Sequence, residues 1–266
     1  MKKLQLLGLL FFTSIIWSQS NPFITSPAIS PDGTTIAFNY QGDVWTVSKT
    51  GNNLKRLTIH EAYDTNPHWS ADGKTIAFNS DRFGNADVFT IPVIGGNPER
   101  ITYHSANDVI TDFTKKGDIY FTTNRNFVQI EREPEVHSVG VDGGTPFRLL
   151  NALGFDATLS PNGKLIAFTR GSCRVEREAY QGPANRDIWL YNTTNDTFTQ
   201  LTDFNGQDLA PQWGNNNTLY FQSARSGKYN IHKLKIDNTG NKTGAVEKIS
   251  NLKEFGLFSY HLSKNG

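Results

Sequence analysis

The sequence predicts an all-β chain folded as a β-propeller. Three observations carry this prediction: a sheet-forming unit recurs, it repeats every 40 to 46 residues, and helical periodicity is nearly absent beyond the N-terminal segment. The unit has three parts. A Ser-Pro-Asp-Gly turn leads into Ile-Ala-Phe, then comes Asp with Val or Ile and an aromatic residue, and last a Leu-Thr or Ile-Thr pair. Short strands at this period are typical of propeller blades with four strands each.

The N-terminal segment, residues 1–20, has the layout of a secretory signal peptide. Lys2 and Lys3 precede an almost wholly apolar run from Leu4 to Trp17, and Ser18-Gln19-Ser20 supplies small residues for cleavage. The run is shorter than the about 20 residues of a membrane span, although an uncleaved anchor is the alternative. We therefore expect export to the periplasm, with the mature domain covering residues 21–266.

The blades are expected in order along the mature chain. Their predicted bounds are residues 26–58, 66–102, 108–150, 155–202 and 210–250, with the start of a sixth blade at 257–266. The expected fold is thus a six-bladed propeller of which five blades and the beginning of the sixth are present. On this interpretation the facing surfaces of blades one and five would be bare, and the chain expressed alone should aggregate or need the missing residues.

The turn of each unit explains its residue types. In Ser30-Pro31-Asp32-Gly33, Pro presets φ, Asp caps the turn and Gly takes the positive φ. The unit is complete or nearly so in blades one, two and four, it is degenerate in blade three, and in blade five the turn reads Asn215-Asn216-Asn217. The apolar Ile-Ala-Phe runs predict strands buried between neighbouring blades.

The second part of each unit predicts structural roles. Asp43, Asp87 and Asp187 recur at the start of a strand, where a carboxylate can accept hydrogen bonds from backbone N–H groups. His137 and His232 take the place of the aromatic residue in their blades. We expect both histidines in the core or between blades.

The chain carries no recognisable centre of chemistry. Its formal net charge of +1 leaves no basic surface for nucleic acid. It lacks a Gly-x-Ser-x-Gly elbow, a His-Glu-x-x-His motif and a phosphate-binding glycine loop, and its histidines lack ligand spacing. We therefore predict no catalytic residue, no metal site and no cofactor. Cys173 lies beside Arg174, which would favour a thiolate, but no base is identifiable and a small loop residue is the preferred interpretation.

Two segments interrupt the repeat, and loops on a rigid scaffold are where function is commonly placed. They are Asn124–Pro134 in blade three and Gly171–Arg186 in blade four. Both carry mixed charge, which is also typical of solvated loops.

The second interruption supports a family resemblance. The stretch Tyr180-Gln181-Gly182-Pro183-Ala184-Asn185-Arg186-Asp187-Ile188-Trp189-Leu190-Tyr191 is the most specific part of a segment, from Gly171 onward, that resembles the N-terminal propeller of tricorn-type serine peptidases. The resemblance covers about residues 21–266. The turn units alone would fit TolB propellers equally well.

The resemblance implies a modular exported peptidase. A six-bladed propeller would be followed by a second propeller, a PDZ domain and a catalytic region related to C-terminal-processing proteases, so the catalytic Ser and His would lie outside this chain. In such enzymes the propellers control the passage of peptides, and arginines hold the carboxylate at the peptide's C-terminus. Arg125, Arg132, Arg174 and Arg177 have the right chemistry for this role, because a guanidinium fork matches a carboxylate. None of them matches a family motif.

Three functions remain open at this point. The preferred one is a non-catalytic module that binds or gates peptide and protein substrates and docks the downstream protease domains of the same parent chain. Homo-oligomerisation is also left open. The alternatives are a stand-alone TolB-like periplasmic scaffold for protein interactions, and an enzyme propeller that binds a glycan or a cofactor in its central channel.

Overall fold

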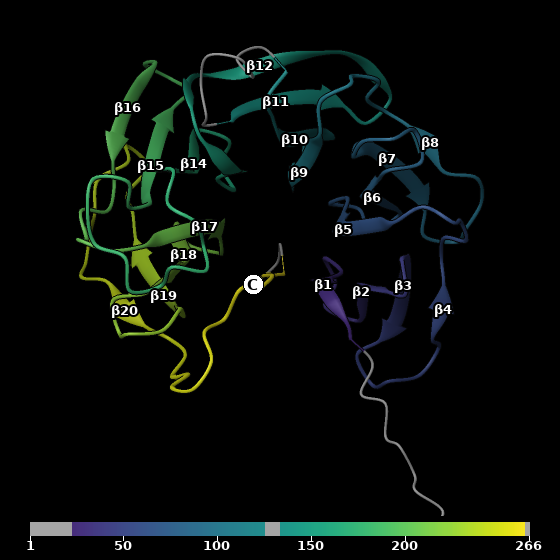
Figure 1. Cartoon of the computed structure of the whole chain (residues 1–266). Helices are drawn as coiled ribbons and strands as arrows, with labels where there is room; N and C mark the ends of the chain where they lie inside the picture. The colour runs from purple at the N-terminus through teal and green to yellow at the C-terminus, as the bar shows by residue number, and fades with distance from the viewer. Residues whose placement is uncertain (1–22, 126–133, 264–266) are drawn as a thin grey trace, which may run out of the picture.

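The computed structural model describes residues 23–125 and 134–263, and within them the chain forms five four-stranded antiparallel sheets. The sheets follow one another around a common centre, as the blades of a propeller do (Figure 1). The described residues contain no helix, and so none that could cross a membrane. The predicted all-β propeller is confirmed, with five blades described.

Each blade uses its four strands in sequence order. Blade one contains β1 (Thr25–Ile29), β2 (Thr35–Tyr40), β3 (Asp43–Ser48) and β4 (Lys55–Arg56). Blade two contains β5 (Asp64–Trp69), β6 (Thr75–Ser80), β7 (Asp87–Pro92) and β8 (Glu99–Arg100). Blade three contains β9 (Asp108–Phe113), β10 (Asp118–Thr123), β11 (Glu135–Gly140) and β12 (Gly143–Leu153). Blade four contains β13 (Phe155–Leu159), β14 (Leu165–Arg170), β15 (Asp187–Asn192) and β16 (Thr197–Gln200). Blade five contains β17 (Asp208–Trp213), β18 (Thr218–Ser223), β19 (Asn230–Lys235) and β20 (Glu247–Lys248).

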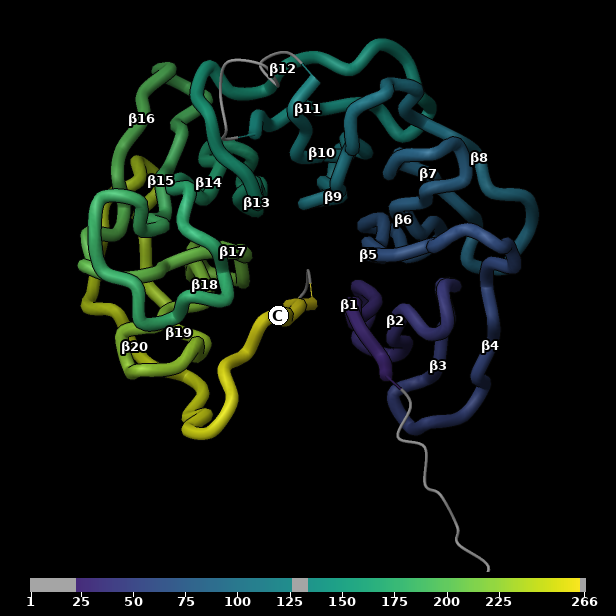
Figure 2. Tube along the Cα trace, viewed as in Figure 1, coloured from purple at the N-terminus to yellow at the C-terminus, as the bar shows by residue number. Residues whose placement is uncertain are grey.

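The first strand of every blade lies nearest the centre and the fourth lies at the rim (Figure 2). The hydrophobic core fills the wedges between consecutive blades. One cluster joins blades one and two through residues such as Ala37, Trp69 and Phe78, and another joins blades four and five through Leu165, Trp213 and Phe221. The buried side chains of the Ile-Ala-Phe strands therefore hold neighbouring sheets together, as predicted.

His137 and His232 are core residues, as predicted from their place in the repeat. Each is almost fully buried and packs against a phenylalanine of its own blade, Phe121 at 5.8 Å and Phe221 at 6.1 Å between ring centroids. Burial lowers the pKa of His137 to about 4, and the charges of Arg125 and Arg148 act in the same direction. Both rings thus serve as neutral aromatic packing.

The third part of the unit closes four of the five described blades through a recurrent hydrogen bond, and blade three, with Leu149-Leu150, lacks the hydroxyl for it. The hydroxyls of Thr58, Thr102 and Thr202 accept the N–H of the second residue of the third strand, at 2.9 to 3.0 Å, and Ser250 does the same in blade five. This bond ties the end of the fourth strand to the start of the third. It gives the third part of the sequence unit its physical reason.

The acidic residues at the start of the third strands are satisfied mainly by side chains. Asp43, Asp87 and Glu135 pair with Arg56, Arg100 and Arg148 of the fourth strand. A backbone donor is present at Asp43, which accepts the His60 N–H at 3.3 Å. The prediction that backbone N–H groups would be the partners missed these arginines, because the pairing depends on strand register rather than on neighbouring residues.

A second series of ion pairs joins the first and second strands of three blades. Asp64, Asp108 and Asp208 begin β5, β9 and β17, and they pair with arginines that follow β6, β10 and β18, namely Arg82, Arg125 and Arg225. The three aspartates are completely buried. A buried carboxylate requires such a partner, so these arginines have a structural role in the repeat.

Residues 257–263 lie between blade five and blade one, where the chain runs toward the centre of the ring (Figure 1). Gln212 on β17 holds this segment at two points: its Nε2 donates to the Tyr260 carbonyl and its Oε1 accepts the Leu262 N–H, both at 2.8 Å. The Tyr260 hydroxyl donates to the Ala210 carbonyl at 2.7 Å. The segment is thus fastened along the inner strand of blade five.

Candidate functional site

The central channel is a large concave site in the part of the chain that the structure describes. Its volume is about 790 Å³, and its wall is formed by the first strands of all five blades together with Phe258–His261. A cavity of this size matches the range of small-molecule and peptide sites in proteins.

The channel wall is shaped by a bulge repeated in the first strands. Ser26, Asn66, Asp156 and Ala210 have positive φ values of 48° to 56°, and the register of the first and second strands shifts next to each of them. Pro follows at Pro27, Pro67 and Pro211. Bulges bend a strand and redirect its side chains, and they recur near functional sites. All four bulge residues line the channel.

Blade four departs from the other blades at this bulge because its residue is acidic. Asp156 accepts a hydrogen bond from the Thr169 hydroxyl at 3.3 Å. Burial raises the pKa of Asp156, an effect that the charge of Arg186 partly offsets. The channel wall therefore contains one acidic group on the inner strand of blade four.

Arg186 is the second departure of blade four. It precedes the first residue of β15, a place held by Gly42, Ala86, Pro134 and Tyr229 in the other blades. The main-chain carbonyl at this position makes the same kind of hydrogen bond in every described blade. It accepts an N–H from the start of the next blade or, at Tyr229, from Leu257. A common backbone role with a different side chain points to a function of the side chain.

The guanidinium of Arg186 lines the channel and keeps hydrogen-bonding capacity. Its Nε donates to the Cys173 carbonyl at 2.7 Å, and its Cζ lies 4.8 Å from the centroid of the Phe155 ring. Within residues 23–125 and 134–263, its Nη atoms make no hydrogen bond or ion pair. An arginine held by one nitrogen and by ring stacking can offer its other nitrogens to a carboxylate.

The inserted segment Gly171–Arg186 positions this arginine. Gly171 is required at its start, because a Cβ there would lie 2.1 Å from the Asn185 carbonyl oxygen, and its φ is +126°. Glu178 fastens the segment to blade five, where its carboxylate accepts the Tyr229 N–H at 3.0 Å and pairs with Lys228 at 2.9 Å. The insertion is therefore packed against the neighbouring blade and ends at the channel.

The four arginines predicted as substrate contacts are dispersed. Arg125 pairs with the buried Asp108 and follows the same pattern as Arg82 and Arg225. Arg174 and Arg177 are exposed on the insertion, outside the channel wall, and Arg177 lies over the Tyr180 ring. Arg132 lies outside the described residues. Their role in binding substrate stays a prediction.

Cys173 is buried, and its thiol donates to the Arg174 carbonyl at 3.6 Å. This environment fits the preferred interpretation of a small residue in a loop. No group of three or more potential metal ligands occurs among the residues that the structure describes.

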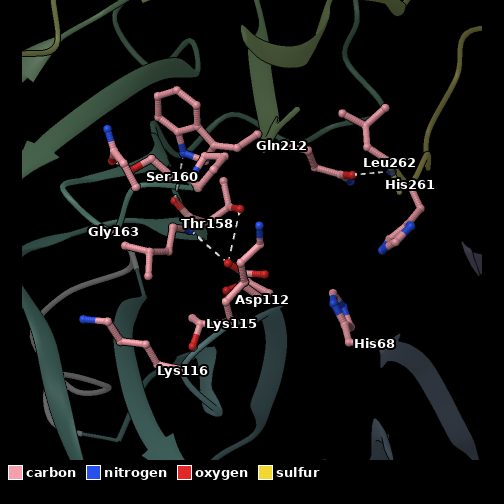
Figure 3. Close-up of a pocket in the computed structure, with 16 residues that line it drawn as sticks. His68, Asp112, Lys115, Lys116, Thr158, Ser160, Gly163, Gln212, His261 and Leu262 are labelled. Atoms are coloured by element: carbon pink, nitrogen blue, oxygen red, sulfur yellow. Dashed lines mark hydrogen bonds between the residues drawn. The ribbon is translucent and has the colours of Figure 1, made fainter. Parts of the chain in front are cut away.

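One end of the channel narrows to a cavity of about 160 Å³ on the side of the Ser-Pro-Asp-Gly turns. Five polar residues from equivalent positions, each two residues before a turn, surround this cavity (Figure 3). They are His68, Asp112, Thr158, Gln212 and His261. Asp112 accepts the Leu159 N–H at 2.9 Å and the Thr158 hydroxyl at 3.3 Å. The rings of His68 and His261 are 6.3 Å apart, edge to face.

Sequence reasoning missed Arg186 and this polar ring, although a signal for both was present. Aligning the blades would have shown that Arg186 replaces small or neutral residues. The same alignment would have shown polar residues in register at His68, Asp112, Thr158, Gln212 and His261.

The comparisons with known proteins agree with this architecture. Residues 21–265 match the family described as the tricorn protease N-terminal β-propeller domain. No curated protein matches the sequence.

Solved structures show the same fold at low identity. Tricorn protease aligns with a TM-score of 0.74 and 18% identity over 88% of this chain, which corresponds to 23% of the tricorn chain. A TolB-type protein from Agrobacterium tumefaciens aligns with a TM-score of 0.66 and 20% identity, over 85% of this chain and 80% of that protein. TolB from Acinetobacter baumannii aligns with a TM-score of 0.62 and 17% identity, over 88% of this chain and 55% of that protein.

Proposed function

Because the chain belongs to the family of tricorn protease N-terminal β-propeller domains, we propose that it is a non-catalytic module that binds and admits peptides for an exported serine peptidase. The bond-breaking residues would reside in downstream domains of the same parent chain. The proposed role of this propeller is to hold peptides in its channel and to dock those domains. The N-terminal residues 1–20 would direct export to the periplasm.

The observation that carries the proposal is Arg186 in the wall of the central channel. Its guanidinium is held through Nε and against the Phe155 ring, and the residue lines a cavity of about 790 Å³. A peptide ends in a carboxylate, which a guanidinium binds with two parallel hydrogen bonds. The acceptors and donors of the bulged inner strands would contact the peptide backbone.

In this proposal residues 257–266 begin a sixth blade. The segment lies beside β17 at the inner face, which is the place that the first strand takes in every other blade. It also carries Leu262 and Ser263 in register with Leu159-Ser160, the residues that precede the turn of blade four. A complete sixth blade would close the ring and cover the edges of its neighbours.

A peptide-binding measurement with paired peptides tests the proposal. Fluorescence polarisation would compare a labelled peptide that has a free C-terminal carboxylate with its C-terminally amidated counterpart. We expect the free acid to bind the protein more tightly, and the substitution Arg186→Gln to weaken its binding about tenfold, since charge-assisted hydrogen bonds contribute about 1.5–3 kcal/mol.

The matched control is Arg174→Gln, which removes an arginine of the same insertion that lies outside the channel wall. It should leave binding unchanged. Equal affinity for both peptides, or equal loss in both variants, would contradict the proposed role of Arg186.

A stand-alone interaction scaffold is the second candidate. It is favoured by two exposed aromatic residues in loops of blade two, Phe83 and Tyr103. Arg100 lies between the rings of Phe83 and Tyr103, 4.1 and 4.7 Å from their centroids, and both rings are more than half exposed. Such a surface suits a protein partner. This candidate predicts partner capture that the substitution Phe83→Ala abolishes and Arg186→Gln does not affect.

A further inference from the structure

The segment 257–263 contacts blades one and five by different chemistry. Toward blade five it uses Gln212, the Ala210 carbonyl and the Tyr229 carbonyl, groups that do not titrate. Toward blade one it uses His261, whose Nδ1 accepts the Ile29 N–H at 3.2 Å across 232 residues of sequence. A further bond, from the Ser263 hydroxyl to the Pro31 carbonyl, is long at 3.4 Å.

The bond between Ile29 and His261 requires a neutral imidazole with its proton on Nε2. A backbone N–H can only donate, so Nδ1 must offer a lone pair. Protonation turns Nδ1 into a donor and places two N–H groups against each other. The bond between Ile29 and His261 is then lost, while the bonds to blade five remain.

Charged and titratable groups share the cavity with His261. His68 on β5 faces it at 6.3 Å between ring centroids, and Lys115 and Lys116 of the turn after β9 share the same cavity. These three groups disfavour a charge on His261. Asp112 on β9 favours it, although two of the contacts to Asp112 are already used by Leu159 and Thr158. Among the described residues that line this cavity, β1 and β17 contribute no charged side chain.

We infer that the seam between blade one and the segment 257–263 is an acid-sensitive joint that His261 opens. At neutral pH the imidazole accepts from Ile29 and the ring of inner strands is joined there. When the imidazole of His261 gains a proton in acid, the seam releases on the side of blade one. The narrow end of the channel, which His261 lines, widens with it.

Amide hydrogen exchange, corrected for the intrinsic pH dependence of exchange, measures this joint in the whole chain. We expect the protection of the Ile29 amide to fall by about tenfold or more between pH 7.5 and pH 5. The Leu262 amide, bonded to the neutral Gln212, should keep its protection over that range. Equal loss at both amides would mean that the whole segment detaches, and no loss at Ile29 would mean that His261 does not control the seam. Either result overturns the inference.

The substitution His261→Asn separates the titration from the hydrogen bond. The asparagine Oδ1 occupies the place of Nδ1 and accepts a hydrogen bond without titrating in this range. Ile29 in this variant should show protection that no longer changes between pH 7.5 and pH 5.

The control is His104→Asn. The Nδ1 of His104 accepts the Ala106 N–H at 3.0 Å within its own loop, so this substitution should leave the pH response of Ile29 as in the unmodified chain. A pH response that persists in His261→Asn would assign the effect to another group.

Discussion

At the scale of residues, the repeat can be followed through one side-chain position on the fourth strand. By register, Arg56, Arg100 and Arg148 stand opposite the aromatic or histidine residue of the third strand, and each pairs with the acidic residue at that strand's start. Blade four has Gln200 at this position, opposite Trp189. Gln200 keeps one bond of the arginine, since its Nε2 donates to the Thr202 carbonyl at 2.9 Å as Arg100 Nε does to Thr102 at 2.8 Å.

Asp187 lacks this arginine, and its pKa is raised. Burial raises the pKa of Asp187 to about 6, and the charge of Asp208 adds to the effect. The Thr202 hydroxyl and Asn185 amide offset only part of it. A carboxyl whose folded pKa lies above its unfolded value near 3.9 lowers stability as the pH rises through the interval from about 4 to 6.

The substitution Gln200→Arg should therefore stabilise the protein at neutral pH. The new guanidinium would lower the pKa of Asp187, so the gain should be full above pH 6, fade between pH 6 and 4, and vanish below. We expect about 1 kcal/mol, because the site is partly exposed to solvent. Urea unfolding at pH 7 and pH 4 measures it.

The uncharged variant Gln200→Met serves as the control for side-chain length. It should not stabilise at either pH. A gain of equal size at pH 4 and pH 7 in Gln200→Arg would show that the arginine acts through packing rather than through Asp187.

At the scale of elements, the first strand of each blade also fastens the blade to its neighbour. The Trp69 indole N–H on β5 donates to the Ala28 carbonyl on β1 at 2.9 Å, and Trp213 on β17 donates to the Thr158 carbonyl on β13 at 3.2 Å. Both indoles also fill the wedge between two sheets. Blade contacts near the channel thus combine packing with a directional bond.

Replacing Trp69 with Phe tests that bond. The ring remains apolar, but the Ala28 carbonyl loses its donor and part of the wedge empties, so we expect the free energy of unfolding to fall by about 2 kcal/mol. Differential scanning calorimetry would record a lower Tm.

Trp45→Phe is the matched comparison. The Trp45 indole donates to the Tyr40 carbonyl inside its own blade at 3.0 Å, and the residue is only partly buried. Its loss should cost less than that of Trp69. Equal or larger destabilisation by Trp45→Phe would argue against a special role for the bond between blades.

At the scale of the whole molecule, the segment 257–263 ties the first and last blades together. It adds hydrogen bonds to blade five and covers Tyr229 with Phe258, whose ring centroids are 5.7 Å apart. Burial raises the pKa of Tyr229 far above its usual value. The segment therefore contributes to the packing of blade five as well as to the joint with blade one.

Deletion of residues 257–266 should lower the Tm by several degrees. Four hydrogen bonds to blade five and two to blade one, of about 1 kcal/mol each, would be lost together with the contact of Phe258, and an apolar surface on blade five would be exposed. Thermal unfolding and binding of a hydrophobic dye measure both effects. Deletion of residues 264–266 alone is the control, and a Tm equally low in both deletions would contradict the role given to 257–263.

Much of the fold was predictable because its causes are local. The turn residues, the alternation of short apolar strands and the period of the unit are set by backbone sterics and by burial, which act within about 40 residues. The core positions of His137 and His232 were predictable for the same reason, because both residues stand at the aromatic position of the repeat unit. The site was less predictable: four arginines of suitable chemistry could be named, and the channel received Arg186 instead.

The sequence by itself determined that the chain is a propeller, how many strands each unit supplies, and which side chains fill the wedges between sheets. Only the tertiary structure decided how the polar groups are placed: Arg186 and Asp156 both line the channel, Gln200 takes the place of the arginine that pairs with the acidic residue in other blades, and His261 accepts the Ile29 N–H. The physical reason is that strand periodicity is encoded by neighbours in sequence. A hydrogen bond across 232 residues exists only because the inner strands converge on one axis.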